Sequence, residues 1–220
     1  MDSTAVNKEI RRSIWSALKN AGFSSFTART AWRHDKDQIE VVNFQSFNRY
    51  NADVLGVTTF SFSVNLGSYL LYVPPQWPPK VKAGRVMPTE SQCHFRGRLT
   101  RTVSQKSNKH SDIWLVDNDG RNLGWCLKDV EQKIPTVHAW FERLRDKKEV
   151  LRILLNEPEE MNSLWGFGNN PSPVRSYLSG YVALTLGKKE LAESKLREAA
   201  DSKCFSQLFS TVEGALLRAL

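Results

Sequence analysis

The sequence contains no long apolar run, and no stretch approaches the roughly 18 residues that a membrane-spanning helix requires. Its first residues, MDSTAVNKEIRRS, have no apolar core of the kind found in secretory signals. Cysteine is scarce: Cys93, Cys126 and Cys204 are odd in number and far apart. Because such spacing suits neither a disulfide framework nor a metal site, we expect a cytoplasmic protein with reduced thiols and no membrane partner.

Signatures of common enzyme classes are also missing. No GxSxG, Walker or GxGxxG motif occurs, so nothing supports a serine hydrolase or a nucleotide-binding domain. The histidines have no HxH, HExxH or CxxC companion; they are His34, His94, His110 and His138. The motifs therefore predict no catalytic residue, no metal ligand and no cofactor. An enzyme would need a site assembled from residues that are distant in sequence, with a metal ion as one option.

One acidic run, Asp117-Asn118-Asp119-Gly120, resembles the start of a calcium-binding loop. Such a loop needs an oxygen ligand two positions before Asp117 and a bidentate glutamate late in the loop. Leu115 and Cys126 occupy those positions. We therefore interpret the run as a hairpin-type turn.

The composition is that of a basic globular protein. Of its 220 residues, 40% are hydrophobic and 10% are aromatic, which is enough to bury a core. Lys and Arg number 31 against 23 Asp and Glu, which gives a formal net charge of +8. The basic residues are scattered, with no block of five or six like charges. Such a charge is typical of a soluble basic surface, and it also permits nucleic-acid binding without requiring it.

The first element has the apolar spacing of a helix. Apolar residues recur every three or four positions up to Asn20, which predicts an amphipathic helix. Gly22 stands where a left-handed C-cap is expected, and Phe23 follows it as the usual hydrophobic contact. The repeat consists of Val6, Ile10, Ile14, Ala17, Leu18 and Ala21.

After this helix, the spacing of apolar residues changes from about 3.6 residues to two, which indicates β-strands. Apolar and polar residues alternate along four segments, and a further short strand is expected at 113–116. Strands with one apolar and one polar side are typical of an antiparallel sheet that is covered on one face. We predict an α+β fold with a mainly antiparallel sheet of five or so strands and helices on one face. The alternating segments are 26–34, 38–47, 59–66 and 93–101.

The remaining segments complete the predicted architecture. Residues 74–90 hold five prolines, which favours a loop because proline cannot donate to a ladder. Helical patterns follow from 126 to 155 and again at 174–186, 188–201 and 203–219. The loop at 158–173 is rich in Gly, Pro and Asn. We therefore predict an α+β domain at 1–157 and a helical appendage at 174–220.

Alternation also assigns the two faces of the sheet. Trp32, Phe44, Phe62 and Phe95 are expected to face the helices, together with Val42, Phe60 and Val64. The opposite side would carry forked guanidinium and amide groups, which suit recognition of carboxylates, phosphates or backbone. A merely solvated sheet face would also be polar, so both interpretations stay open. This polar face consists of Arg29, Arg33, Asn43, Gln45, Ser61, Ser63, Asn65, His94, Arg96 and Arg98.

The order of these motifs resembles the bacterial domain of unknown function 4304 family over about residues 8–150. The resemblance rests on LKNAGF, FTARTAWR, VVNFQSF, FSFSVNLGSYL and IPTVHAWFERL. The matching residues are Gly22-Phe23, Arg29 with Trp32-Arg33, Asn43 with Gln45, and Phe62-Val64-Asn65-Leu66-Gly67. The family implies an α+β fold and no established activity. Related small bacterial domains are often immunity or conflict-system components that bind a protein partner, which is an association only.

The C-terminal segment is similar to a single tetratricopeptide repeat. Gly180, Ala192, Leu196 and Ala199 fall at that family's packing positions, and Leu186-Gly187 fits its turn. One copy cannot build a solenoid, which needs about three units. The resemblance therefore implies a helical hairpin that either packs on the domain or docks a partner.

Three functions remain open at this stage. The leading hypothesis is a non-enzymatic binding protein that engages a protein partner through the polar face or the proline-rich loop. Trp77, which stands between prolines, would be an aromatic anchor for the partner, or it would only pack the loop against the rest of the protein. The second hypothesis is nucleic-acid binding through Arg29, Arg33, Arg96, Arg98 and Arg101. The third is a metal-dependent enzyme whose site is assembled by the fold.

Overall fold

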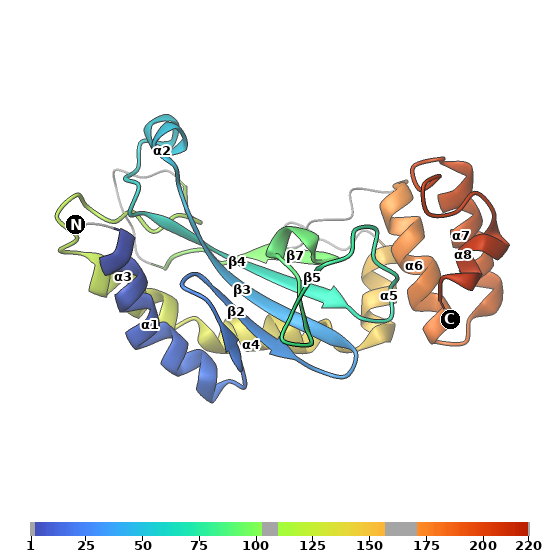
Figure 1. The fold of residues 1–220 in the computed structure, drawn as a ribbon, viewed down its shortest axis with the longest axis horizontal. Helices are drawn as coiled ribbons and strands as arrows, with labels where there is room; N and C mark the ends of the chain where they lie inside the picture. Colours follow the sequence, from blue (N-terminus) through green and yellow to red (C-terminus); the bar gives the residue numbers. More distant parts are fainter. Residues whose placement is uncertain (1–2, 103–109, 157–170, 220) are drawn as a thin grey trace. The chain divides into compact units, whose positions relative to one another are not determined.

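The computed structural model describes residues 3–102, 110–156 and 171–219 of the chain (Figure 1). The fold is α+β, as the alternation and helix periods predict, and its main sheet is antiparallel. The sheet is hydrogen-bonded in the order β1-β2-β3-β4-β7. Its strands are β1 (Ser25–Phe26), β2 (Thr30–His34), β3 (Gln38–Ser46), β4 (Phe62–Leu70) and β7 (Phe95–Arg98).

The other regular elements of the described chain are helices and one β-hairpin. The strands β5 (Lys80–Lys82) and β6 (Arg85–Met87) pair with each other in a separate antiparallel hairpin. A short 3-10 helix, η1, spans Glu90–Gln92. The α-helices are α1 (Ser3–Asn20), α2 (Arg49–Leu55), α3 (Leu123–Glu131), α4 (Ile134–Arg143), α5 (Lys147–Leu155), α6 (Pro173–Thr185), α7 (Lys189–Asp201) and α8 (Val212–Leu217). Across the described segments, no helix combines the length and the apolar character needed to cross a bilayer.

The chain forms two compact units, and strands of the sheet supply residues to both. Unit 1 consists of Met1–His34, Glu40–Gly67 and Gly97–Trp140. Unit 2 consists of Asp35–Ile39, Ser68–Arg96 and Phe141–Leu220. The sequence-based division into 1–157 and 174–220 stays a prediction, because most of its loop at 158–173 lies outside the described residues.

In unit 1, the N-terminal helix forms as its periodicity predicts. Ile10, Ile14 and Leu18 are fully buried, and α1 lies beside α3. Trp15 packs edge-on against Phe44 at 5.5 Å and donates its indole N–H to the carbonyl of Thr27 at 3.0 Å. After the helix, Gly22 adopts a φ of 90°, which only glycine tolerates easily, and ends it as predicted.

The central strand β4 differs from the prediction that one side of it faces solvent. Every residue of β4 is buried, including the polar Ser63 and Asn65. At the start of the strand, the buried Ser61 hydroxyl accepts the amide N–H of Val116 at 3.1 Å. Trp114 forms a single bridge with Phe62 in place of the short strand expected at 113–116. Asn65 and Ser68 on β4 donate to the side-chain oxygens of Gln45 and Gln38, at 2.9 and 3.1 Å. The Ser63 hydroxyl is buried with no hydrogen-bond partner among the described residues.

Two further elements were not expected from the sequence. Helix α2 begins at an Asn48 cap whose side chain accepts the amide of Asn51 at 2.8 Å. Within the proline-rich segment, Ala83 and Gly84 have φ values of 49° and 73°, which close the β5–β6 hairpin. The expected helix at 203–219 is shorter and starts only at Val212.

In unit 2, helices α6 and α7 form an antiparallel hairpin, and the two helices lie side by side in Figure 1. Gly180 lets them approach, because a Cβ at that position would lie 2.7 Å from Cγ of Leu196. Tyr177 is fully buried in α6 and stacks on Phe205 with ring centroids 4.6 Å apart. The predicted small and apolar packing positions of this hairpin are therefore buried contacts.

Candidate functional site

The predicted polar face contains one connected group of side chains, in unit 1. Arg98 Nε donates to Asn65 Oδ1 at 2.8 Å, and Asn65 Nδ2 donates to Gln45 Oε1 at 2.9 Å. The same guanidinium donates to Asp112 Oδ2 at 2.6 Å. The alternation correctly brings Gln45, Asn65 and Arg98 to one face. Their polar groups, however, largely satisfy one another, and Asp112 neutralises the arginine charge.

Arg33 lies on the opposite face from the one predicted. Its Nη1 donates to the carbonyl of Ala21 at 2.7 Å, its guanidinium lies 5.4 Å from the ring centre of Phe23, and it pairs with the buried Glu40. This residue is therefore bound to the end of α1 and contributes nothing to an open polar surface.

The correction follows from the register of β2. Phe26 pairs with Ala31 across the ladder, and Phe26 packs against Trp15 of α1 at 5.5 Å. Ala31 and Arg33 consequently face α1, and Trp32 faces away from it. The assignment of Trp32 to the helix-covered side was wrong by one residue, and such a slip reverses every side chain of a strand.

The other polar-face residues are spread over separate environments. Asn43 Nδ2 donates to Thr30 Oγ1 at 2.9 Å, and Ser63 is fully buried. Arg29 is half-buried before β2, and desolvation lowers the pKa of its guanidinium from the ordinary value. Arg96 Nε pairs with Glu90 at 2.7 Å in unit 2. The predicted cluster of arginines therefore does not form one exposed basic surface.

Trp77 is exposed and its segment is anchored. The tryptophan side chain is 69% exposed, in the middle of the sequence Pro74-Pro75-Gln76-Trp77-Pro78-Pro79. The carbonyl of Pro74 accepts the hydroxyl of Tyr177 at 2.6 Å, and the carbonyl of Pro75 accepts Nη2 of Arg218 at 3.1 Å. Prolines restrict φ and these two hydrogen bonds hold the segment that precedes the indole.

The hairpin that follows Trp77 is basic. Lys80, Val81 and Lys82 are all exposed along β5, and Arg85 begins β6. The sequence contains no Asp or Glu from Leu71 to Thr89. An exposed tryptophan is therefore followed by an exposed hairpin of one charge sign.

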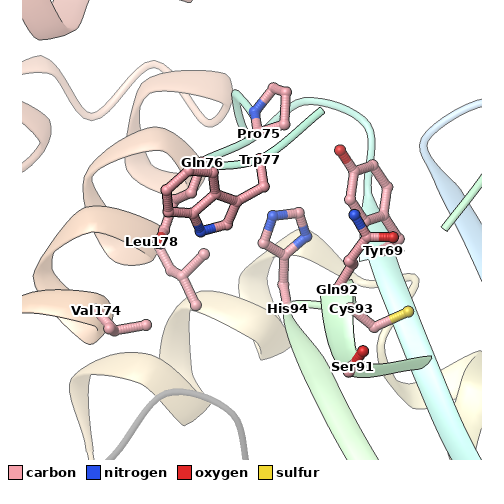
Figure 2. A pocket seen from close by; sticks show the side chains of 10 residues that line it. All are labelled: Tyr69, Pro75, Gln76, Trp77, Ser91, Gln92, Cys93, His94, Val174 and Leu178. Atoms are coloured by element: carbon pink, nitrogen blue, oxygen red, sulfur yellow. The ribbon is translucent and has the colours of Figure 1, made fainter. Parts of the chain in front are cut away.

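A pocket of about 270 Å³ lies beside Trp77 in unit 2 (Figure 2). Figure 2 shows the indole of Trp77 next to Leu178, and the imidazole of His94 between Trp77 and Tyr69. Val174 and Gln92 also line this pocket. We call this cavity the Trp77 pocket.

His94 is held in one tautomer in the Trp77 pocket. Its Nδ1 accepts the backbone N–H of Leu70 at 2.9 Å, and its ring lies 4.8 Å from the ring of Tyr69. Desolvation by burial lowers the pKa of His94 to about 4. The ring is therefore neutral near pH 7, and the proton is on Nε2, where it is a hydrogen-bond donor.

Cys93 beside it does not have the surroundings of a nucleophile. Burial raises the pKa of this thiol well above its ordinary value, with a further contribution from Glu90. Its Sγ–H donates to the carbonyl of Thr89 at 3.5 Å. Reactive cysteines need a lowered pKa and an electropositive pocket, so Cys93 serves as a packing residue. Within residues 3–102, 110–156 and 171–219, no group of three or more His, Cys, Asp or Glu could hold a metal ion.

The sequence identified Trp77 and His94 separately and could not bring them together. Leu178 lies far along the chain from Tyr69, Trp77 and His94, and no spacing rule links the four residues. The hairpin had a usable signal, because KVK and RVM flank the Ala83-Gly84 pair in a two-residue hairpin pattern.

Comparison with known proteins gives one match. The model of the family described as Domain of unknown function (DUF4304) matches residues 14–143. No curated protein and no solved structure matches the chain.

Proposed function

The chain belongs to the DUF4304 family, a domain of unknown function, and from the geometry around Trp77 we propose that it is a non-enzymatic protein that binds a partner protein. One observation carries the proposal: an exposed tryptophan is presented by a proline-flanked segment whose carbonyls are hydrogen-bonded to Tyr177 and Arg218. Exposed aromatic anchors of this kind dominate the energetics of protein interfaces.

Anchoring matters because binding must offset the cost of ordering side chains and loops. Each rotamer-rich side chain that is immobilised on binding costs about 0.5–1.5 kcal/mol. The prolines and the two hydrogen bonds restrict the Trp77 backbone before any partner arrives. A tryptophan on a backbone that is already restricted therefore loses less on binding, and its large ring supplies contact area with few torsions.

The surroundings indicate the charge of the partner. The β5–β6 hairpin exposes Lys80 and Lys82, and no acidic residue interrupts it. Charge complementarity would speed association with an acidic partner surface and suppress binding to basic ones. We therefore propose that the partner presents apolar groups to Trp77 and carboxylates to the hairpin.

The proline-rich segment supports this function better than the polar face does. On that face, Arg98 is paired with Asp112, Arg96 is paired with Glu90, and Arg33 faces α1. Guanidinium groups that are neutralised by carboxylates make poor phosphate ligands. The same pairs weigh against nucleic-acid binding through these arginines.

We also propose a cytoplasmic location, in which the three cysteines stay reduced. In the described residues, Cys93 and Cys126 are buried and Cys204 is exposed, and the three form no disulfide. A role as an immunity or conflict-system component of a bacterium fits a small non-enzymatic binder. That role rests on association with similar domains and not on geometry.

Affinity capture from the native host tests the proposal. Tagged wild-type protein would be compared with Trp77→Ala and with Tyr50→Ala, since Tyr50 is an aromatic residue that is 75% exposed on α2. We expect a specific protein in the wild-type and Tyr50→Ala captures and its loss from the Trp77→Ala capture. The same proteins in all three captures would contradict the proposal, as would retention of nucleic acid that is lost at raised salt.

A further inference from the structure

The Trp77 pocket has the size of a side-chain socket. Its volume of about 270 Å³ lies below the roughly 300–1,000 Å³ that is usual for small-molecule and cofactor sites. The indole of Trp77, the isobutyl group of Leu178 and the ring of Tyr69 provide apolar walls (Figure 2). A cavity of this size suits an apolar side chain better than a whole small molecule.

Two polar side chains of the pocket, His94 and Gln92, offer hydrogen-bond donors to a ligand. Since His94 Nδ1 already accepts from Leu70, its Nε2–H is the group that a ligand can use. Gln92 accepts from the backbone and the hydroxyl of Thr89 through Oε1, at 3.0 and 3.1 Å, which leaves its amide N–H groups as donors. None of the described residues that line the pocket is Asp or Glu. A ligand group that meets His94 and Gln92 is therefore a hydrogen-bond acceptor, and no carboxylate of the described lining would pair with an ammonium or a guanidinium.

A neutral acceptor suits the pocket better than an anion. The lining residues include no Lys or Arg among those described, so a buried carboxylate would lack a counter-charge. A peptide carbonyl is neutral and needs only a hydrogen-bond donor. Every residue of a bound peptide carries such a carbonyl next to its side chain. The basic hairpin, which lies further along the chain, would meet the acidic residues that flank this segment.

The walls of the pocket are held in place from several sides. His94 is fixed by Leu70, Gln92 belongs to a capping box at η1, and Leu178 is buried in α6. The fourth wall, Trp77, lies on the anchored proline-rich segment. A preformed socket lowers the conformational cost of docking.

We propose that the Trp77 pocket receives an apolar side chain of the partner protein, and that His94 Nε2–H donates to the backbone carbonyl next to that side chain. This inference rests on the proposed function and adds the chemistry of recognition: a short apolar anchor, its own carbonyl, and acidic flanks. His94 is a positioning donor for the partner's backbone, and Leu178 with Trp77 selects for the apolar side chain.

Small amides test the socket without the partner. The probes are the N-acetyl N-methylamides of leucine, phenylalanine and glycine, followed through the indole N–H signal of Trp77 in ¹H–¹⁵N spectra. We expect saturable shifts with the leucine and phenylalanine probes and none with the glycine probe. Equal responses to all three, or a response to tetramethylammonium alone, would overturn the assignment.

Two variants address the pocket itself. Val174→Trp fills the cavity and should abolish the shifts, whereas Glu193→Trp, on the exposed side of α7, should leave them unchanged. His94→Asn places an amide oxygen where Nδ1 accepts from Leu70 but removes the Nε2–H donor, and should weaken binding about three- to tenfold. Full-strength binding by either Val174→Trp or His94→Asn would contradict the proposal; circular dichroism confirms that each variant is folded.

The two proposals can fail separately. If a captured partner is lost from Trp77→Ala but retained by Val174→Trp, partner binding stands and the socket is wrong. If the partner is retained by Trp77→Ala as well, the proposed function is wrong. If Trp77→Ala, Val174→Trp and His94→Asn all weaken capture while Glu193→Trp does not, both proposals are supported.

Discussion

The phenol of Tyr177 donates a hydrogen bond of 2.6 Å to the carbonyl oxygen of Pro74, 103 positions earlier in the chain. Burial raises the pKa of Tyr177 above its ordinary value, so the phenol keeps its proton and is a donor near neutral pH. A buried α6 residue thus fixes the start of the segment that carries Trp77. Presentation of the proposed anchor depends on the C-terminal helices and not on the loop alone.

Removal of this hydrogen bond should loosen the Trp77 segment. Tyr177→Phe keeps the ring stacked on Phe205 and leaves the Pro74 carbonyl without this donor, which we expect to lower the free energy of unfolding by about 1 kcal/mol. Chemical denaturation measures the loss, and the line width of the Trp77 indole signal measures the loosening.

Tyr181→Phe provides the matched control. Tyr181 donates to the carbonyl of Ala215 at 2.9 Å and is equally buried in α6. Both variants should lose similar stability. Tyr177→Phe should alter the Trp77 signal and weaken partner capture more strongly, because Tyr181 reaches that segment only through Arg218. Equal effects on the Trp77 signal would show that the segment is held by other contacts.

Two helical glycines should respond to alanine in opposite directions. A Cβ at Gly180 would lie 2.7 Å from Leu196 Cγ, and forcing helices α6 and α7 apart costs about 1–3 kcal/mol. A Cβ at Gly124 in α3 meets nothing within 4 Å, so Gly124→Ala should stabilise by about 0.5 kcal/mol through helix propensity. Thermal unfolding of the two variants checks the signs, and stabilisation by Gly180→Ala would show that the hairpin is loosely packed.

Much of the fold could be predicted from the sequence because side-chain periodicity reports which side of an element is buried. The four-residue spacing in α1 and the alternation in β3 and β4 gave the elements and their order. Periodicity fails where both sides are covered: Ser63 and Asn65 are polar but buried in a central strand, and the Asn65 amide donates to Gln45. A polar residue in a strand therefore does not by itself indicate exposure.

The face of β2 shows the limit of alternation in a short strand. Trp32 and Arg33 are neighbours, and the hydrophobic ring was assigned to the helix-covered side. In the fold, the long Arg33 side chain reaches the carbonyl of Ala21 at 2.7 Å and covers the ring of Phe23. Arginine can lie on a covered face when a carboxylate and a backbone carbonyl accept hydrogen bonds from its guanidinium, which no local pattern predicts.

The candidate site was predictable only in part for a different reason. Proline on both sides of Trp77 signals a stiff, exposed aromatic residue, and that signal is local. The pocket depends on where the fold brings Leu178 of α6 and His94, which precedes β7, and this is a long-range property. Local sequence can therefore indicate an anchor but not the cavity beside it.

The buried arginine of α6 is expected to be essential for stability. Arg175 is 1% exposed and donates to the carbonyls of Leu154 at 3.0 Å, Ile153 at 2.8 Å and Asn156 at 3.3 Å, at the C-terminus of α5. Arg175→Met should cost about 3 kcal/mol, because it leaves these carbonyls without their charged donor. Urea unfolding measures the loss, and Arg197→Met, on the exposed side of α7, should change stability by less than about 0.5 kcal/mol.

His94 should make stability depend on pH between about 4 and 6.5. Burial lowers its pKa in the folded state to about 4 from 6.5, so the unfolded chain binds the proton more readily in this window. Stability is therefore full above pH 6.5 and falls as the pH drops toward 4, by about 2–3 kcal/mol in total. Glu149 adds a further loss at lower pH, because folding lowers its pKa from 4.5 to about 2, chiefly through its hydrogen bond from Arg152.

A comparison of variants isolates the histidine. His94→Asn keeps an acceptor for the Leu70 amide but does not titrate, so its free energy of unfolding should fall less steeply than that of the wild type over this window. Urea titrations at half-unit pH intervals give both curves, and their difference should rise from pH 6.5 to pH 4 and then level off. Parallel curves would mean that His94 is protonated as easily in the fold as in the unfolded chain, and its ring would then not be the neutral donor that the Trp77 pocket requires.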